Sequence, residues 1–189
     1  TIGSGSCAVL LTDRELSRTG NRLIGAAVRA HTQFHGLCQS GNDEAVGSGM
    51  QPLMETDSET LMAEGIATGA AAFEKLLVES GWRRESIDRT VCHQVGTRHR
   101  VAMLDAMGLK IESDSVSFPK LGNTGSVALP LTVASAAQQG HFSPGDRIAM
   151  LGIGSGINSV MLTARWGRTP VAGNNKELQN PPLALKIPG

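Results

Sequence analysis

Three short stretches of this chain carry polar groups of the kind that stabilise developing negative charge. They are His93 at the end of an apolar run, Asn123 inside the sequence Gly-Asn-Thr-Gly, and the glycine-rich segment Gly152 to Gly156. Imidazole, carboxamide and backbone N–H groups are all hydrogen-bond donors. Donors aimed at a single substrate oxygen are what a reaction needs when that oxygen gains charge. The three stretches together indicate charge stabilisation, and none of them supplies an obvious nucleophile.

Each stretch also has a purely structural interpretation. Asn123 lies between Gly122 and Gly125 and is suited to an Asx-type turn that caps the following helix. His93 fits a core histidine that is satisfied by structural partners. The glycines from Gly152 to Gly156 fit a tight hairpin that needs small residues. The residues alone leave both interpretations open, and the coincidence of the three stretches is the argument for a site.

The alternation of apolar segments and turn residues predicts the elements that position these groups. Strands are predicted at residues 7–11, 22–31, 87–94, 115–118, 147–151 and 157–166, and helices at 57–81, 95–107 and 127–139. Asp57 is the expected N-cap of the first helix and Gly81 its expected end. Residues 31–52 are predicted as a loop, and residues 167–189 as a tail or linker.

Strand–helix alternation with short connections predicts a three-layer α/β architecture around a parallel core. The last two strands are close in sequence, so we expect them to form a hairpin that adds an antiparallel edge. The carboxyl ends of parallel strands share one edge of a sheet, where ligands collect. His93, Asn123 and the Gly152–Gly156 segment are therefore expected at the same edge.

Composition limits the classes of function. The chain has 189 residues with 17 basic and 17 acidic side chains, which argues against a nucleic-acid or membrane-surface protein. No apolar run approaches the roughly 20 residues of a membrane span, and no signal peptide is visible. We therefore predict no nucleic-acid partner, no membrane span and a cytoplasmic location. Because Thr1 is not a natural start, we expect the true N-terminus to lie further upstream.

The cysteines and histidines do not predict a metal site. Cys7, Cys38 and Cys92 show no paired spacing and are predicted to be reduced thiols that serve as small packing residues. His31, His35 and Cys38 lie close in sequence, but their spacing matches no closed four-ligand set. We predict that no metal is bound.

Taken in order, three motifs resemble a known family: Val-Cys-His-Gln at 91–94, Gly-Asn-Thr-Gly at 122–125, and Leu-Gly-Ile-Gly-Ser-Gly at 151–156. They are similar to the C-terminal half of thiolase-fold condensing enzymes, most of all the β-ketoacyl-ACP synthase III family and its OleA-like branch. The resemblance covers about residues 1–166. It implies a thiolase-like three-layer αβα fold, with a βαβαβαββ half at 21–166, the final strand of the N-terminal half within 1–20, and the tail or linker at 167–189.

The resemblance implies Claisen condensation of two acyl thioesters, acyl-CoA with acyl-CoA in the OleA-like reaction. His93 and Asn123 would stabilise the enolate, and backbone N–H groups near Ser155 and Gly156 would hold the acyl oxygen. No cofactor is implied, because acyl-CoA or acyl-ACP enters as substrate.

The family's nucleophilic cysteine lies in the N-terminal half, and none of Cys7, Cys38 and Cys92 matches its motif. The implied partners are therefore that Cys-bearing half, on the same polypeptide or a separate subunit, and a second copy in a homodimer of the complete enzyme.

Three alternatives remain open. The reaction could be a decarboxylative condensation with malonyl-ACP in fatty-acid or polyketide synthesis. The chain could also be a non-catalytic subunit that completes a partner's site, or a structural half that mainly dimerises. Arg83, Arg84, Arg98 and Arg100 are candidates for a CoA or carrier-protein phosphate, although most are expected on a solvated surface.

Overall fold

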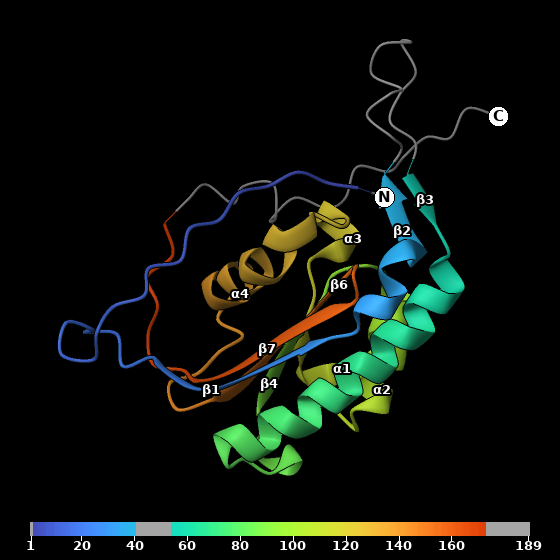
Figure 1. Cartoon of the computed structure of the whole chain (residues 1–189). Coiled ribbons are helices and arrows are strands. Elements are labelled where there is room, and N and C mark those ends of the chain that lie inside the picture. Colours follow the sequence, from blue (N-terminus) through green and yellow to red (C-terminus); the bar gives the residue numbers. More distant parts are fainter. Residues whose placement is uncertain (1, 41–53, 173–189) are drawn as a thin grey trace.

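A mixed sheet with helices on both faces organises the molecule (Figure 1). The computed structural model describes residues 2–40 and 54–172. The sheet strands are β1 (Arg22–Ala30), β4 (Arg89–Cys92), β5 (Asp114–Ser115), β6 (Arg147–Gly154) and β7 (Asn158–Arg165). The α-helices are α1 (Ser58–Ser80), α2 (Thr97–Ala106), α3 (Phe118–Leu121) and α4 (Ala128–Gln138). A separate two-stranded ribbon joins β2 (Cys38–Ser40) to β3 (Met54–Thr56).

The five strands of the sheet follow the order β1-β7-β6-β4-β5. Strand β4 runs parallel to both β5 and β6, whereas β7 is antiparallel to β6 and to β1. The predicted hairpin of the last two strands is confirmed. The prediction that it forms an edge is wrong, because β1 pairs along β7 from Arg22 opposite Arg165 to Ala30 opposite Asn158. The parallel strands β4, β5 and β6 end at one edge, where the site was expected.

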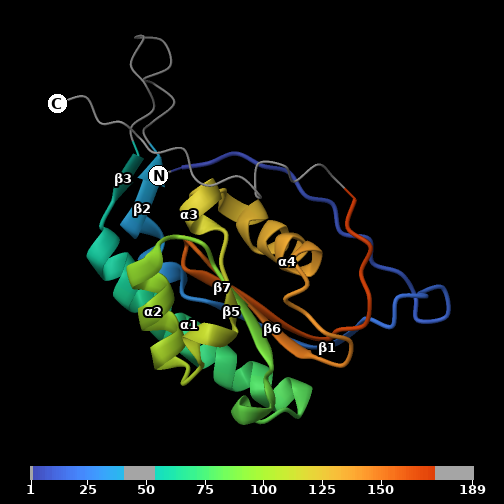
Figure 2. The same ribbon diagram turned by 180° about the vertical axis from the view of Figure 1, so that it is seen from behind.

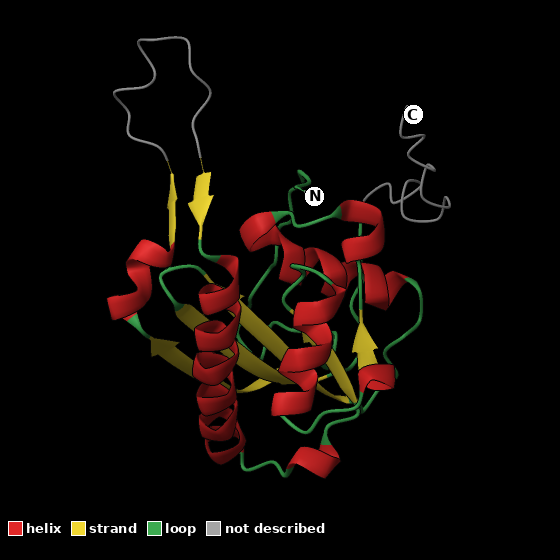
Figure 3. Cartoon of the chain, turned by 90° about the vertical axis from the view of Figure 1, so that its right-hand side faces the viewer, coloured by secondary structure: helices red, strands yellow, loops and turns green. Residues whose placement is uncertain are grey.

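The two faces of the sheet are covered by different helices (Figures 2 and 3). Helices α1 and α2 lie on one face, where Phe73, Leu76, Met103 and Ile153 belong to the larger core cluster. Helix α4 lies on the other face and packs against β4, β5 and β6, where the smaller cluster includes Val91. The predicted three-layer αβα architecture is confirmed. None of the helices within residues 2–40 and 54–172 has both the length and the hydropathy needed to cross a lipid bilayer.

Helix α1 begins and ends where its cap residues predict. The Asp57 carboxylate accepts a hydrogen bond from the backbone N–H of Thr60 at 3.1 Å, which satisfies one of the free donors at the helix start. Gly81 follows the last turn with φ 66°, a left-handed conformation that glycine adopts without strain. These two local signals fix the length of the helix that covers β1 and β7.

The predicted strand at residues 7–11 is wrong. Residues 7–11 have no regular secondary structure and are exposed, with Leu10 87% accessible. The segment passes along the outside of α4 (Figures 1 and 2), and no strand among the described residues pairs with it. A strand needs a neighbour for its backbone groups, so an apolar run without one stays irregular.

The predicted strand at 115–118 is only partly correct. Strand β5 consists of Asp114 and Ser115, and Phe118 already begins helix α3. The strand ends early because the backbone N–H groups of Ser117 and Phe118 donate to the Gln94 side chain and not to a neighbouring strand. The fixed φ of Pro119 suits the first turn of the helix that follows.

Two further predicted segments differ in part from the structure. The predicted loop at 31–52 contains a 3₁₀ helix at Thr32–Leu37 and then β2, and residues 41–52 lie outside the described residues. The first residue of the predicted tail is hydrogen-bonded to the segment before β1, because the Gly167 N–H donates to Asn21 Oδ1 at 2.6 Å. The rest of the tail beyond residue 172 lies outside the described residues, and the domain boundaries stay predictions.

The packing of α1 on the sheet can be tested with a matched pair of variants. Leu76 is fully buried in the larger core, whereas Val78 on the same helix is 80% exposed. Leu76→Ala should lower the free energy of unfolding by about 2–5 kcal/mol, because it leaves a cavity. Val78→Ala should change it by less than about 0.5 kcal/mol. Urea denaturation measures both, and equal effects would mean that α1 does not pack as described.

Candidate active site at the carboxyl end of β4

His93 follows directly after β4 at the carboxyl edge of the parallel strands. Its backbone N–H donates to the Leu151 carbonyl of β6 at 2.9 Å, so the residue continues the β4–β6 pairing. A small cavity of about 70 Å³ lies beside it. The residues that line this cavity are His93, Gln94, Gly96, Thr97, Arg100, Val116, Phe118 and Pro119.

The surroundings of His93 keep its imidazole neutral. Burial, and in second place the neighbouring His99, lower the pKa of His93 from 6.5 to about 4, since both disfavour the charged ring. The two rings lie edge to face with their centroids 6.3 Å apart. Burial also lowers the pKa of His99, whose buried Nδ1 has no hydrogen-bond partner in the described chain. At neutral pH His93 therefore offers one N–H donor and one acceptor.

Gln94 is almost completely buried, with 1% of its surface accessible. Its Nε2 donates to the Cys92 carbonyl at 2.7 Å. Its Oε1 accepts from the backbone N–H groups of Ser117 at 2.9 Å and Phe118 at 3.0 Å. Gln94 is the last residue of the motif Val-Cys-His-Gln, but its residue type alone did not indicate a role. A long polar side chain that directly follows a buried strand was the available signal, because buried amides are nearly always hydrogen-bonded.

A buried ion pair lies beneath the same strand end. Asp114 accepts hydrogen bonds from Arg100 Nε at 2.6 Å, Thr90 Oγ1 at 3.0 Å and the Cys92 N–H at 3.0 Å. Burial raises the pKa of the Asp114 carboxyl, while its hydrogen bonds from Arg100 and Thr90 act in the opposite direction. Arg100 also donates to the carbonyl of Asp114. Arg100 is therefore already engaged, which weakens its candidacy for a substrate phosphate.

The other candidate arginines differ in their surroundings. Arg84 forms an ion pair with Glu74 and lies over the Phe73 ring, 5.7 Å from its centroid. It is therefore already engaged, which weakens its candidacy for a phosphate. Arg83 and Arg98 are exposed, as the prediction of a solvated surface expected.

Asn123 lies in the connection between α3 and α4. Its Oδ1 accepts the Gly125 N–H at 2.9 Å, and Gly122 and Gly125 both have positive φ, 68° and 65°. The structural interpretation of this residue is thus correct for the amide oxygen, which forms an Asx-type turn. The amide nitrogen donates to no acceptor among the described residues. Asn123 does not line the cavity beside His93.

The glycine-rich segment is mostly strand. Strand β6 continues to Gly154, so that only Ser155, Gly156 and Ile157 form the turn into β7. The backbone groups of Ile157 and His31 bond to each other, at 2.8 and 3.2 Å, and tie the turn to the end of β1. Ser155 is exposed. Neither Ser155 nor Gly156 lines the cavity beside His93.

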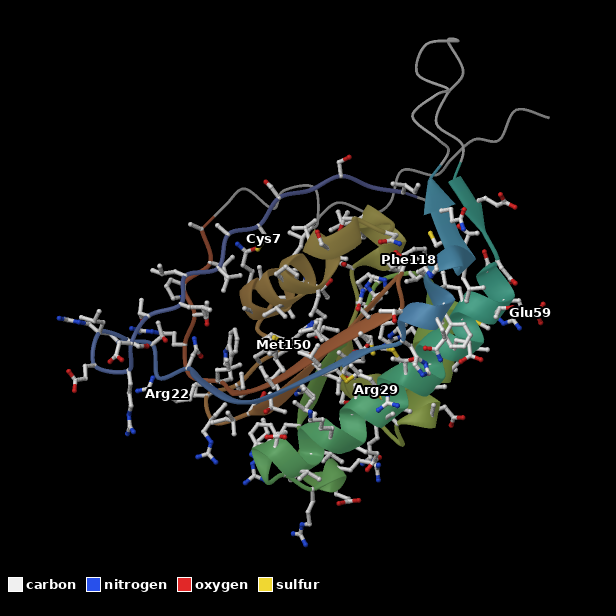
Figure 4. The ribbon with its side chains drawn as sticks, viewed as in Figure 1. Cys7, Arg22, Arg29, Glu59, Phe118 and Met150 are labelled. Carbon is white, nitrogen blue, oxygen red and sulfur yellow. The ribbon has the colours of Figure 1, made fainter. Side chains whose placement is uncertain are left out.

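The three cysteines are free thiols. Cys92 is fully buried, and burial together with Asp114 raises its pKa well above the ordinary value, which makes it a poor nucleophile. Cys7 is exposed on the segment outside α4, away from Phe118 at the start of α3 (Figure 4). Cys38 is half-buried and accepts a hydrogen bond from the Thr56 hydroxyl.

The histidines of residues 31–52 have structural partners of their own. His31 Nδ1 lies 3.2 Å from the Thr68 hydroxyl, and His35 Nδ1 lies 3.0 Å from the Thr32 carbonyl. Within residues 2–40 and 54–172, no group of three or more His, Cys, Asp or Glu side chains is arranged to hold a metal ion.

Comparison with known proteins identifies the kind of chain that carries this arrangement. Residues 77–166 match the model of the C-terminal region of 3-oxoacyl-[acyl-carrier-protein] synthase III. An acyl-CoA:acyl-CoA alkyltransferase of Shewanella oneidensis is 40% identical over 169 residues, which are 88% of this chain and 48% of that protein. The chain thus spans about half the length of the curated relatives it matches.

Solved structures agree in fold. Xanthomonas campestris OleA with bound lauric acid and lauroyl-CoA superposes with a TM-score of 0.68 at 32% identity, over 77% of this chain and 41% of that one. The 3-oxoacyl-[acyl-carrier-protein] synthase III of Aquifex aeolicus gives a TM-score of 0.70 at 18% identity, over 79% of this chain and 46% of that one. The thiolase-like fold of this chain is therefore established.

The pKa of His93 predicts how stability depends on pH. Between pH 6.5 and about 4 the unfolded chain binds a proton at residue 93 that the folded chain does not, so stability falls as the pH drops through this window. The shift corresponds to a loss on the order of 3 kcal/mol. His93→Gln should remove most of this fall, as measured by denaturant unfolding at pH 7 and pH 4.5. His35→Gln, at an exposed histidine, is the control, and an unchanged pH dependence in His93→Gln would contradict the burial of the ring.

Proposed function

Because this chain belongs to the β-ketoacyl-ACP synthase III family of thiolase-fold condensing enzymes, whose C-terminal half it spans, we propose that it supplies the enolate-stabilising part of a Claisen condensing site. The substrates are two acyl thioesters, and the preferred reaction joins acyl-CoA with acyl-CoA. The 40% identity over 88% of this chain to an acyl-CoA:acyl-CoA alkyltransferase favours that substrate pair.

The proposal rests on two side chains in the connections at one edge of the sheet. One is a neutral imidazole, and the other is a carboxamide whose nitrogen has no acceptor among the described residues. His93 ends β4, and Asn123 lies in the connection from β5 to α4. The low pKa of His93 keeps it an uncharged N–H donor at neutral pH. The Asx-type turn holds the Asn123 oxygen on the Gly125 N–H, which leaves the amide nitrogen as the available donor.

The proposed chemistry follows from the charge that develops on a thioester oxygen. An acyl group is first carried on a cysteine thiolate as a thioester. A base that we place outside this chain takes a proton from the α-carbon of a second thioester, or the second thioester loses CO₂ in the decarboxylative variant, and the electron pair left behind makes it an enolate. The N–H groups of His93 and Asn123 stabilise the enolate oxygen. The enolate carbon then attacks the acyl-cysteine carbonyl and displaces the thiolate, while backbone N–H groups near Ser155 and Gly156 hold that carbonyl oxygen.

We propose that the acyl-accepting cysteine comes from the N-terminal half of the family fold, on the same polypeptide or a separate subunit. The burial and raised pKa of Cys92 support a nucleophile from elsewhere. Val28 and Val160 oppose one another on β1 and β7 and face the α4 side, because their neighbours Ala27 and Met161 are buried against α1. They are 61% and 48% exposed, which supports a partner on this face. The homodimer of the complete enzyme stays a prediction.

Decarboxylative condensation with malonyl-ACP is the second candidate reaction. It is favoured by the match of residues 77–166 to the 3-oxoacyl-[acyl-carrier-protein] synthase III model. The two candidates are distinguished by offering the complete enzyme acyl-CoA alone or acyl-CoA with malonyl-ACP. Release of CO₂ would identify the decarboxylative reaction, and a product from acyl-CoA alone would identify the other.

Two substitutions test whether His93 and Asn123 act in condensation and not in acyl loading. His93→Ala and Asn123→Asp, each in the enzyme completed by its Cys-bearing half, should slow condensation by about a hundredfold or more, because each removes a donor worth on the order of 3 kcal/mol. Acyl loading should stay within a few-fold of the unsubstituted enzyme. Mass spectrometry of the acyl-enzyme measures loading, and product formation from acyl-CoA measures condensation.

His35→Ala is the matched control, since this histidine is exposed and its one hydrogen bond to a described residue is with the Thr32 carbonyl. It should leave both steps unchanged. An equal loss of loading and condensation in His93→Ala and Asn123→Asp would refute the proposed roles. Acylation of this chain on its own by a long-chain acyl-CoA would refute the need for the other half.

A further inference from the structure

We propose that Gln94 is a positioning residue that sets the placement of His93 relative to the turn that carries Asn123. The inference rests on the proposed function, because it assigns Gln94 a task in the same site. It concerns the geometry of the two donors and gives Gln94 no contact with the reacting atoms.

The Gln94 amide forms a hydrogen bond that spans His93. Its Nε2 donates to the carbonyl of Cys92, the residue on the other side of His93. The backbone N–H of His93 is held by the Leu151 carbonyl of β6. With both neighbours and its own N–H bonded, the backbone of His93 has little freedom to rotate. The backbone bonds thereby set the direction of the Cα–Cβ bond that carries the imidazole.

The same amide also bonds to the segment that leads to Asn123. Its Oε1 accepts from the N–H groups of Ser117 and Phe118, where helix α3 starts. Helix α3 is only one turn long and ends at Leu121, two residues before Asn123. Phe118 also lines the cavity beside His93. One side chain therefore joins the connection after β4 to the connection after β5.

Solvent has little access to the Gln94 amide and to the Ser117 backbone. Gln94 is 1% accessible and Ser117 is 4% accessible. A buried backbone group that loses its partner is costly, so removal of the amide should make the two connections move rather than remain in place unpaired. A displacement near 1 Å in a catalytic group can lower a rate by about a hundredfold.

The polarity of the amide provides a specific test. A glutamate at position 94 has the same shape, and when protonated it offers an O–H to the Cys92 carbonyl and an oxygen to both N–H groups. When ionised, it places an oxygen against that carbonyl in place of a donor. Burial should raise the pKa of the new carboxyl, so Gln94→Glu should regain function as the pH falls.

Other ionisable groups on the surrounding elements could add to this pH profile. They are Cys92 and His93 at the end of β4, His99 and Arg100 on α2, Asp114 on β5 and Lys120 on α3. Each is present in every variant, so the comparison between variants isolates the effect at position 94.

The experiment compares Gln94→Glu with Gln94→Met, which keeps the length of the side chain but makes none of the three bonds. In the complete enzyme, Gln94→Met should slow condensation by about a hundredfold at every pH between about 6 and 8. Gln94→Glu should match it at the upper end and recover at least tenfold towards the lower end. Acyl loading should change little in either. Gln39→Glu is the control, because the Gln39 amide also donates to a backbone carbonyl, that of Gly36, but is exposed.

Two outcomes would overturn the inference: condensation close to normal in Gln94→Met, or the same pH profile in Gln94→Glu and Gln94→Met. NMR of this chain separates the inference from the proposed function. Gln94→Met should shift both the His93 ring signals and the Asn123 side-chain amide signals, and Gln39→Glu should shift neither. If the unsubstituted enzyme fails to condense while both signals shift, the proposed function fails and the positioning role stands. If neither signal shifts, the positioning role fails.

Discussion

The buried carboxylate of Asp114 is the interaction on which the candidate site most depends. It lies at the start of β5 and accepts hydrogen bonds from the Arg100 guanidinium on α2 and from Thr90 and Cys92 on β4. A charge with no accessible surface is tolerated only when its hydrogen bonds are complete. Because the donors come from α2 and β4 and the acceptor from β5, satisfying this charge fixes these three elements relative to one another.

The chemical character of the site follows from this arrangement. His93 extends from a strand end whose backbone is bonded to β6 on one side and to Asp114 on the other, so the ring is held where burial lowers its pKa to about 4. The Gln94 side chain then bonds the end of β4 to the start of α3. A neutral imidazole on a rigid support is suited to stabilise an enolate oxygen, because it donates a hydrogen bond without the cost of burying a charge.

Local chemistry made part of this predictable from sequence. Asp57 and Gly81 marked the ends of α1, and the helix–strand alternation predicted the three layers. Long-range pairing was not predictable in the same way. Strand β1 pairs with β7 along the outer side of the hairpin, and residues 7–11 lack a strand neighbour among the described residues. At the site, residue type singled out His93 and Asn123 but did not reveal that the Asn123 oxygen bonds Gly125. Gln94 and Asp114 escaped notice because their partners are backbone groups and side chains of other elements, which no spacing rule reveals.

The proposed enolate stabilisation requires that two N–H donors, from His93 and Asn123, meet at one thioester oxygen. The most direct test is a crystal structure of the complete enzyme with an unreactive analogue of an acyl thioester enolate bound. We expect a His93 ring nitrogen and the Asn123 amide nitrogen within hydrogen-bond distance of the same analogue oxygen. A structure in which either side chain points away from that oxygen would contradict it.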